Sequence, residues 1–194
     1  MRKFHPPSGR FDGVIGGPPC QKFSGLNNLA LARGVVFVNL IPEFERCVGE
    51  AGPSWFVMEN VRAAPLPKTP GFELHAQIIN NRWLGEDQNR ERRITFGTRD
   101  GRKLHLRPAA LESPRWEHAV TSAHAGERRV RSKGRIARYT VPRALELQGL
   151  PPDFFAKSPL TQQGKLKVIA QGVPLPMGRA IARGVKAALA KEAA

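Results

Sequence analysis

The stretch Phe11–Ser24, FDGVIGGPPCQKFS, decides the fold that this sequence predicts. Its apolar start predicts a short buried strand over 11–15, and the glycines and prolines that follow predict a loop. Open α/β sheets place their chemistry in loops at the carboxyl ends of strands. Cys20 lies in this loop behind two prolines that restrict the backbone, so the loop can hold the thiol in one place.

A helix and a second strand follow this loop. Residues 39–48 carry apolar side chains at helical spacing, with Asn39 suited to the cap, and Trp55–Met58 predicts the next buried strand. A strand, a helix and a strand in sequence imply a right-handed crossover and parallel pairing. We therefore expect a mostly parallel sheet in which Glu59, directly after the second strand, lies beside the Cys20 loop.

The rest of the chain divides by composition. In the middle of the chain we expect a loop over 63–71, a helix over 72–80 and a strand at the end of 88–97. Toward the end of the chain we expect two helices. One lies within 139–151, starting after Thr140 and ending before Gly149, and the other covers 179–190. Between them, residues 98–138 are rich in Lys and Arg and poor in apolar periodicity. This pattern predicts three segments: 1–97, a short basic region over 98–138, and 139–194.

Composition narrows the classes of function. The chain has 194 residues, a formal net charge of +15 and a pI of about 11.0, so nucleic acid is the expected partner. No apolar run is long enough for a membrane span, and no signal peptide is visible, so we expect no membrane association. Two cysteines without metal-type spacing favour a reduced, cytoplasmic protein with no metal site.

Five motifs appear in a fixed order along the chain. They are GGPPCQKFS at 16–24, ENV at 59–61, QNRER at 88–92, LQGLP at 147–151 and AQGVP at 170–174. A lone cysteine is more often a small buried hydrophobe than a nucleophile, and a lone QxRxR string is weak. Together and in this order, the motifs resemble those of the DNA (cytosine-5) methyltransferases.

The resemblance implies an α/β fold, namely part of the Rossmann-like sheet of the S-adenosylmethionine-dependent methyltransferases, with 98–138 as a small basic target-recognition lobe. It implies that the thiolate of Cys20 adds to C6 of a flipped cytosine, which activates C5 for methylation, while Glu59 contacts the ring near N3. The implied catalytic residues are Cys20, Glu59, Arg90 and Arg92. The implied contacts with double-stranded DNA come from Gln21, Ser24, Gln88, Arg128, Arg129, Arg131 and Lys133.

The resemblance also implies S-adenosylmethionine as cofactor, with Pro19, Gln171, Gly172 and Val173 on one wall of its site. The match departs from the family where Pro142-Arg143 replaces an Arg-Glu pair and where Ala170-Gln171 replaces Gly-Asn. The glycine-rich turn and earlier strands of the family have no counterpart here. We therefore expect the catalytic part of a methyltransferase that binds the cofactor weakly by itself.

Several explanations of the chain stay open from the sequence. It could be a fragment, one subunit of a split enzyme whose N-terminal part is separate, or a degenerate copy. A non-catalytic DNA-binding relative is the main alternative to an enzyme. Methylation of tRNA is a third hypothesis, because a related branch of the family shares these motifs.

Overall fold

The computed structural model describes residues 3–24, 31–32, 34–109, 113–121, 130–132, 135–137 and 139–190. The chain divides into two compact units. The first unit comprises 1–79, 91–105 and 186–194, and the second comprises 80–90 and 106–185. The segment boundaries expected at 97 and 138 stay a prediction.

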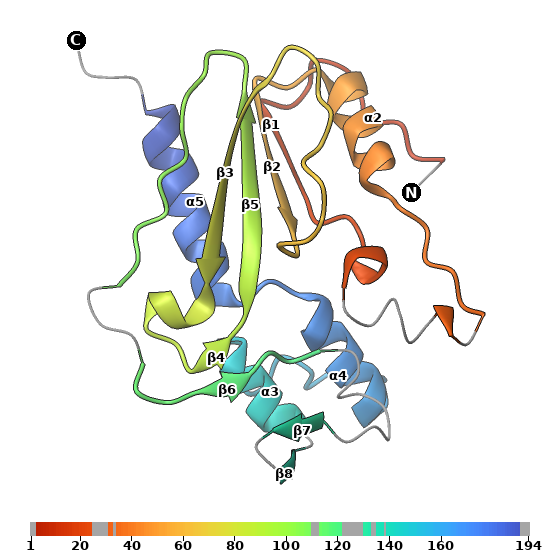
Figure 1. The fold of residues 1–194 in the computed structure, drawn as a ribbon, viewed down its shortest axis with the longest axis vertical. Coiled ribbons are helices and arrows are strands. Elements are labelled where there is room, and N and C mark those ends of the chain that lie inside the picture. Colours follow the sequence, from red (N-terminus) through yellow and green to blue (C-terminus); the bar gives the residue numbers. More distant parts are fainter. Residues whose placement is uncertain are drawn as a thin grey trace. The chain divides into compact units, whose positions relative to one another are not determined.

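A four-stranded sheet forms the centre of the first unit (Figure 1). Its order is β1 (Gly13–Gly16), β2 (Trp55–Asn60), β5 (Glu91–Thr98) and β3 (Glu73–Asn80). The pair β1–β2 is parallel, as predicted, with Val14 opposite Phe56. The pair β2–β5 is antiparallel, with Glu59 opposite Ile94. The sheet is therefore mixed, and the expectation of a mostly parallel sheet is wrong for these strands.

Helix α2 (Ile41–Ala51) covers one face of β1 and β2 because its apolar stripe needs a partner. Ile41, Phe44 and Val48 are buried in one cluster with residues of β2, and the rings of Phe44 and Phe56 meet edge to face at 5.7 Å. The Asn39 side chain accepts a hydrogen bond from the Ile41 amide at 3.0 Å. The N-cap residue is Leu40, which makes no side-chain cap hydrogen bond, so the expectation of Asn39 at the cap is wrong by one position.

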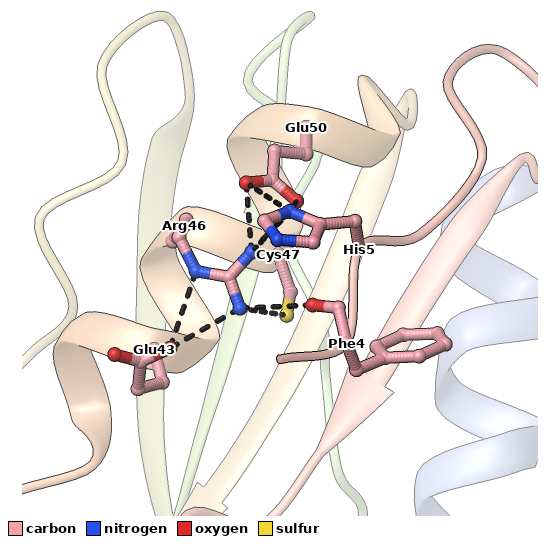
Figure 2. A network of polar contacts seen from close by, with 6 residues as sticks. All are labelled: Phe4, His5, Glu43, Arg46, Cys47 and Glu50. Atoms are coloured by element: carbon pink, nitrogen blue, oxygen red, sulfur yellow. Dashed lines mark hydrogen bonds and ion pairs between the residues drawn. The ribbon is translucent and has the colours of Figure 1, made fainter. Parts of the chain in front are cut away.

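A polar network ties the segment before β1 to this helix (Figure 2). Arg46 donates to Glu50 at 2.7 Å, to Glu43 at 3.1 Å and to the carbonyl of Phe4 at 2.9 Å. The ring of His5 lies 3.1 Å from the same Glu50 carboxylate. Farther along, the Gly9 amide donates to the carbonyl of Ala51, so this segment follows the last turns of α2.

One element of the first unit differs from its prediction. The sequence predicts a helix over 72–80, but Glu73–Asn80 is strand β3. Its place beside β5 in the sheet supplies backbone partners that its local sequence does not reveal. The β-branched pair Ile78-Ile79 fits this strand, and Ile79 is buried. The β5 strand itself is predicted from the end of 88–97 and is confirmed.

Three helices and short strand pairs make up the second unit. The helices are α3 (Val141–Leu147), α4 (Gln162–Gln171) and α5 (Leu175–Leu189), the last of which ends in the first unit. The strand pairs are parallel β4 (Gln88–Asn89) with β6 (Glu117–His118), and antiparallel β7 (Val130–Ser132) with β8 (Arg135–Ala137). Two 3-10 turns complete the described elements, η1 (Gln21–Phe23) and η2 (Asn81–Leu84).

The core of the second unit joins α3 and α4. Leu145, Leu147, Leu166 and Ile169 are buried in one cluster, with Val120 among them. Helix α3 starts at the residue after Thr140, whose side chain accepts from the Arg143 amide, as expected. Helix α5 starts four residues before the predicted 179, and α4 has no predicted counterpart because its apolar pattern is weak.

Two classes of feature are not found in the described part of the chain. None of its helices has the length and apolar composition needed to cross a membrane. None of its His, Cys, Asp and Glu residues gather in a group of three or more that could hold a metal ion.

Candidate active site

Cys20 lies where the sequence places it, in the loop that follows β1. Pro18 is buried, Pro19 is exposed and Cys20 is partly exposed. The carbonyl of Cys20 accepts a hydrogen bond from the Phe23 amide at 2.9 Å, which closes the turn η1. The backbone at Cys20 is thus held by the turn, while the residue stays partly exposed.

The end of β2 holds this loop in place. Asn60, which is buried, donates from its side-chain amide to the carbonyl of Pro18 at 3.1 Å. A Cβ added to Gly17 would lie 3.1 Å from Oε2 of Glu59, so the loop backbone passes close to that carboxylate. The ENV motif and the PPC loop are therefore neighbours, which the parallel pairing of β1 and β2 predicted.

Glu59 has an arginine partner from the neighbouring strand. The Nε of Arg92 donates to Oε1 of Glu59 at 2.7 Å, and their side chains are only 15% and 20% exposed. A second contact runs from Nη1 of Arg92 to the carbonyl of Glu91 at 2.7 Å. One carboxylate oxygen of Glu59 is thus held by Arg92, while the other faces the loop at Gly17.

Arg90 has a different environment from Arg92. It is 4% exposed, belongs to the second unit and donates to the carbonyls of Val120, Ala170 and Gly172 at 2.8–3.0 Å. These contacts join three segments of that unit, which is a structural role. The catalytic role that the sequence suggests for Arg90 stays a prediction.

Gln88 is also buried, with 0% of its surface exposed. Its amide donates to the carbonyl of Leu147 at 2.6 Å and to Gln148 at 3.1 Å, and its Oε1 accepts from the Val120 amide at 3.2 Å. All of these contacts lie within the second unit. A direct contact of Gln88 with DNA stays a prediction, and the contacts observed give it a structural role.

The other predicted DNA contacts fall into two groups. Gln21 is exposed beside Cys20, and Ser24 is half-buried with its hydroxyl donating to the carbonyl of Gln21 at 3.1 Å. Arg128, Arg129 and Lys133 lie outside the described residues. Arg131 lies in β7, of which only the backbone is described.

The four residues expected at the cofactor lie in different units. Pro19 belongs to the first unit, and Gln171, Gly172 and Val173 belong to the second. Gln171 is the exposed last residue of α4, and the carbonyl of Gly172 accepts from Arg90 at 3.0 Å and from Gln148 at 3.1 Å. The role of these four residues at the cofactor stays a prediction.

Sequence reasoning missed two residues that organise these motifs. Asn60 holds the Cys20 loop through its hydrogen bond to the Pro18 carbonyl. Gln148 donates to the carbonyl of Ile169 at 2.6 Å and accepts a hydrogen bond from Gln88. Each is a polar residue next to an apolar run, Asn60 after Val57-Met58 and Gln148 after Leu147. That pattern is a usable signal, because polar groups at buried positions are almost always hydrogen-bonded.

Comparisons with known proteins identify the family of this chain. Residues 2–122 match the family model of the C-5 cytosine-specific DNA methylase. The type II methyltransferase M.HgiDI of Herpetosiphon aurantiacus is 34% identical over 100 residues, which cover 45% of this chain and 31% of that protein. The type II methyltransferase M.DdeI of Desulfomicrobium norvegicum is 33% identical over 112 residues, covering 48% and 26%. The chain thus spans less than a third of the length of either relative.

Solved structures show the same fold. The Entamoeba histolytica methyltransferase EhMeth superposes with a TM-score of 0.67 at 9% identity, over 93% of this chain and 78% of that chain. The S. pombe Dnmt2 methyltransferase gives a TM-score of 0.61 at 10% identity, over 90% and 77%. The fold is therefore that of S-adenosylmethionine-dependent methyltransferases, and the match over 2–122 shows that the chain belongs to the C-5 cytosine-specific DNA methylase family.

Proposed function

We propose that this chain is the catalytic part of a DNA (cytosine-5) methyltransferase, with Cys20 as its nucleophile. The observation that supports the proposal best is the set of contacts between the Cys20 loop and the ENV motif. Asn60 holds the Pro18 carbonyl, and Glu59 lies against Gly17, so the thiol loop and the carboxylate are fixed to one another within the first unit. Both groups follow neighbouring parallel strands, where open sheets carry their chemistry.

The proposed chemistry begins with the thiolate of Cys20. The thiolate forms a bond to C6 of cytosine, and the electrons of the C5–C6 double bond move onto the ring, which makes C5 nucleophilic. C5 then takes up an electrophile, loses its own proton to a base, and the thiolate leaves as the double bond reforms. Covalent catalysis of this kind splits one difficult step into easier ones.

Glu59 and Arg92 have different proposed roles toward the cytosine ring. Arg92 holds Oε1 of Glu59 at 2.7 Å, so we infer that Oε2, on the side of Gly17, meets the N3 edge of the base. A carboxylate in this place offsets the charge that the ring gains when Cys20 adds. Arg92 then acts as a positioning residue for Glu59, because preorganised partners cost no reorganisation during reaction.

Duplex DNA is the proposed substrate, and the target cytosine would leave the stack to reach Cys20. Extruding a paired base costs a few kcal/mol, which phosphate contacts of a strongly basic protein offset. The net charge of +15 and the basic segment 98–138 supply such contacts. These contacts position the duplex without reading its sequence.

The complete enzyme would take its methyl group from S-adenosylmethionine. Because the chain spans less than a third of the length of the two relatives named above, we propose that further methyltransferase sequence, within a longer chain or as a separate subunit, supplies the rest of the cofactor site. We also propose that the protein acts on DNA in the cytoplasm. The family match and the relatives named as type II methyltransferases support this proposal.

Tritium release tests the nucleophile without requiring methyl transfer. Duplex DNA labelled with tritium at C5 of cytosine should lose the label to water, because C5 exchanges its proton while Cys20 is bonded to C6. The Cys20→Ser variant should bind the same duplex and release no label. Wild-type binding without release, or equal release by the variant, would contradict the proposal. A competing tRNA that removes release from DNA would favour an RNA substrate.

A further inference from the structure

A third arginine directly follows the QxRxR motif. Arg93 stands next to Arg92 on β5, and successive side chains of a strand point to opposite faces of the sheet. Arg92 pairs with Glu59 on one face. Arg93 lies opposite Asn60 in the pairing of β5 with β2, on the face of the sheet that α2 covers. The two neighbouring arginines therefore have different partners.

Arg93 is bound to the turn that follows the ENV motif, residues 61–64. Its Nη1 donates to the carbonyl of Ala64. The Ala64 amide donates in turn to the carbonyl of Val61 at 3.0 Å, which closes the turn. Ala64 is 1% exposed and packs in the apolar cluster that α2 forms with β2. A half-buried cation beside an apolar cluster is costly unless its donors are bonded, so this contact fixes Arg93 and the turn together.

The same turn is connected to the Cys20 loop through Asn60. The Val61 amide donates to Oδ1 of Asn60 at 2.9 Å, and Nδ2 of Asn60 donates to the carbonyl of Pro18 at 3.1 Å. Asn60 is 2% exposed, and these two contacts use both ends of its amide group. The orientation of that amide, and with it the position of the Pro18 carbonyl, therefore depends on where the turn lies.

We propose that Arg93 is a positioning residue for Cys20, acting through the turn 61–64 and through Asn60. The inference rests on the proposed function, since a nucleophile needs a fixed position and a structural thiol does not. Every residue on this path belongs to the first unit. A displacement of about 1 Å can cost about 100-fold in rate, so a contact remote from the reacting atoms can control the reaction.

Arg99 gives a matched control in the same unit. It follows β5 directly, and its Nε donates to the carbonyl of Pro53 at 3.1 Å. Arg93→Met and Arg99→Met each remove a cation and a hydrogen bond to a backbone carbonyl, but only the first of these carbonyls lies in the turn after ENV. Cys47 on α2 gives a second control within each variant, because it is also a free, partly exposed thiol.

The first measurement needs no DNA. The full chain is treated with iodoacetamide, and mass spectrometry follows the alkylation rates of Cys20 and Cys47 separately. In Arg93→Met the rate at Cys20 should rise severalfold while the rate at Cys47 stays the same, because the released loop opens more often. Arg93→Lys, which keeps a cation and a donor, should restore most of the wild-type ratio of the two rates. Arg99→Met should leave that ratio unchanged.

Tritium release at saturating duplex DNA gives the second measurement. Arg93→Met should lower it about 10- to 100-fold, because the thiolate loses its alignment with the base. The DNA concentration that gives half-maximal release should change little, because phosphate contacts supply most of the affinity. Asn60→Ala should cause a similar loss, and the double variant should lose no more than the worse single variant. Arg99→Met should release the label as the wild type does.

Three results would overturn the inference. In the first, Arg93→Met keeps the wild-type ratio of the two alkylation rates, whether both rates rise or neither does. In the second, Arg99→Met has the same effects as Arg93→Met. In the third, the losses of tritium release caused by Arg93→Met and Asn60→Ala multiply, which would mean that the two residues act by separate routes.

Two further provisions keep the outcomes distinct. If Arg93→Met does not fold, Arg93→Gln is measured in its place, and the same ratio of alkylation rates decides. The proposed function fails separately, by absence of tritium release from DNA that the wild type binds. The alkylation ratio needs neither DNA nor catalysis, so it still decides whether Arg93 holds the Cys20 loop.

Discussion

Arg92 and Glu59 form an ion pair between β5 and β2, with Nε and Oε1 2.7 Å apart and both side chains mostly buried. They come from different motifs, QxRxR and ENV, which lie 33 positions apart in the sequence at about one strand spacing in space. The pair matters because removing one member of a shielded ion pair leaves the other without compensation. Arg92 therefore decides where the carboxylate of Glu59 lies.

The first prediction concerns this pair. Arg92→Gln should lower tritium release from cytosine C5 by about 100-fold or more, because Glu59 loses its fixed orientation. DNA affinity should change little, because contacts with phosphates supply most of it. Arg62→Gln is the control, because Arg62 makes a looser pair with Glu91 at 3.5 Å and is 72% exposed. An Arg92→Gln variant that folds and releases tritium normally would remove Arg92 from the proposed mechanism.

The second prediction concerns Gln88. Replacing it with leucine removes hydrogen bonds to Leu147, Gln148 and Val120 from a fully buried position. The cost should be about 2–4 kcal/mol in the free energy of unfolding, because buried partners stay unsatisfied. Gln163→Leu, on the exposed face of α4, should change stability by less than about 0.5 kcal/mol. Urea unfolding of both variants measures the difference, and equal stabilities would show that the hydrogen bonds of Gln88 do not stabilise the unit.

Some of this architecture could be predicted from the sequence, because it depends on residues that are close together in the chain. The Cys20 loop, α2 and β2 have strong signals. These are an apolar run stopped by glycine and proline, a proline in the first turn of α2, and Gly52 directly after the last residue of α2, with a φ of +61°. Parallel pairing then placed Glu59 beside the loop, and the contact at Gly17 confirms that they are neighbours. Short-range chemistry was sufficient for these elements.

The remaining elements depend on partners that are distant in sequence. Residues 73–80 form a strand because β5 lies beside them, although their composition favoured a helix. The two arginines of QxRxR look equivalent in sequence, yet Arg92 pairs with Glu59 while Arg90 holds three carbonyls of the second unit. The break between the units falls between these arginines, and no local pattern marks it.

The third prediction tests the packing under the catalytic loop. A Cβ at Gly16 would lie 2.7 Å from the ring of Phe44, which is 2% exposed and part of the core. Gly16→Ala should therefore destabilise the protein by about 1–3 kcal/mol and reduce tritium release, because the loop begins at the next residue. Gly49→Ala, on the same helix as Phe44 with open space around it, should stabilise by about 0.5–1 kcal/mol. Thermal unfolding of both variants measures whether each substitution lowers or raises stability. A Gly16→Ala variant as stable as the wild type would show that the ring of Phe44 can move away.

The fourth prediction concerns acid and the network of Figure 2. The hydrogen bond from Arg46 is the main cause that holds the pKa of Glu50 below its ordinary value of 4.5. Because the folded pKa lies below the unfolded pKa, this contribution to stability is present above the unfolded value and disappears as pH falls through the folded value. Glu50→Gln should therefore lose less stability than the wild type between about pH 5 and pH 3.

Urea midpoints at several pH values measure this difference. Asp153→Asn, in an exposed turn, controls for the removal of one negative charge. Identical slopes of stability against pH for the wild type and Glu50→Gln would show that the interaction with Arg46 forms in the unfolded chain too. The effect should be small, because exposed ion pairs contribute little.

The fifth prediction separates catalysis from DNA binding. Cys20→Ser keeps the shape of the loop and removes the thiolate, so tritium release should disappear while affinity for duplex DNA stays close to that of the wild type. Replacing Arg128, Arg129, Arg131 and Lys133 together should weaken binding to all sequences and lower the salt slope by about one unit for each cation that no longer neutralises a phosphate. Measured at saturating DNA, release by this quadruple variant should persist, because none of the four substituted residues is a proposed catalytic residue.

The two variants are informative because they should fail at different steps. If Cys20→Ser releases tritium, the thiol is structural, and the hydrogen bond between Pro18 and Asn60 serves only the fold. If the quadruple variant binds one sequence normally and others poorly, the four substituted cations contribute to the reading of bases. Phosphate interactions alone cannot produce that result, since they are the same at every base pair. The dependence of DNA affinity on salt could also stay the same after the four cations are removed. In that case the phosphate contacts would be assigned to the exposed basic residues of the first unit.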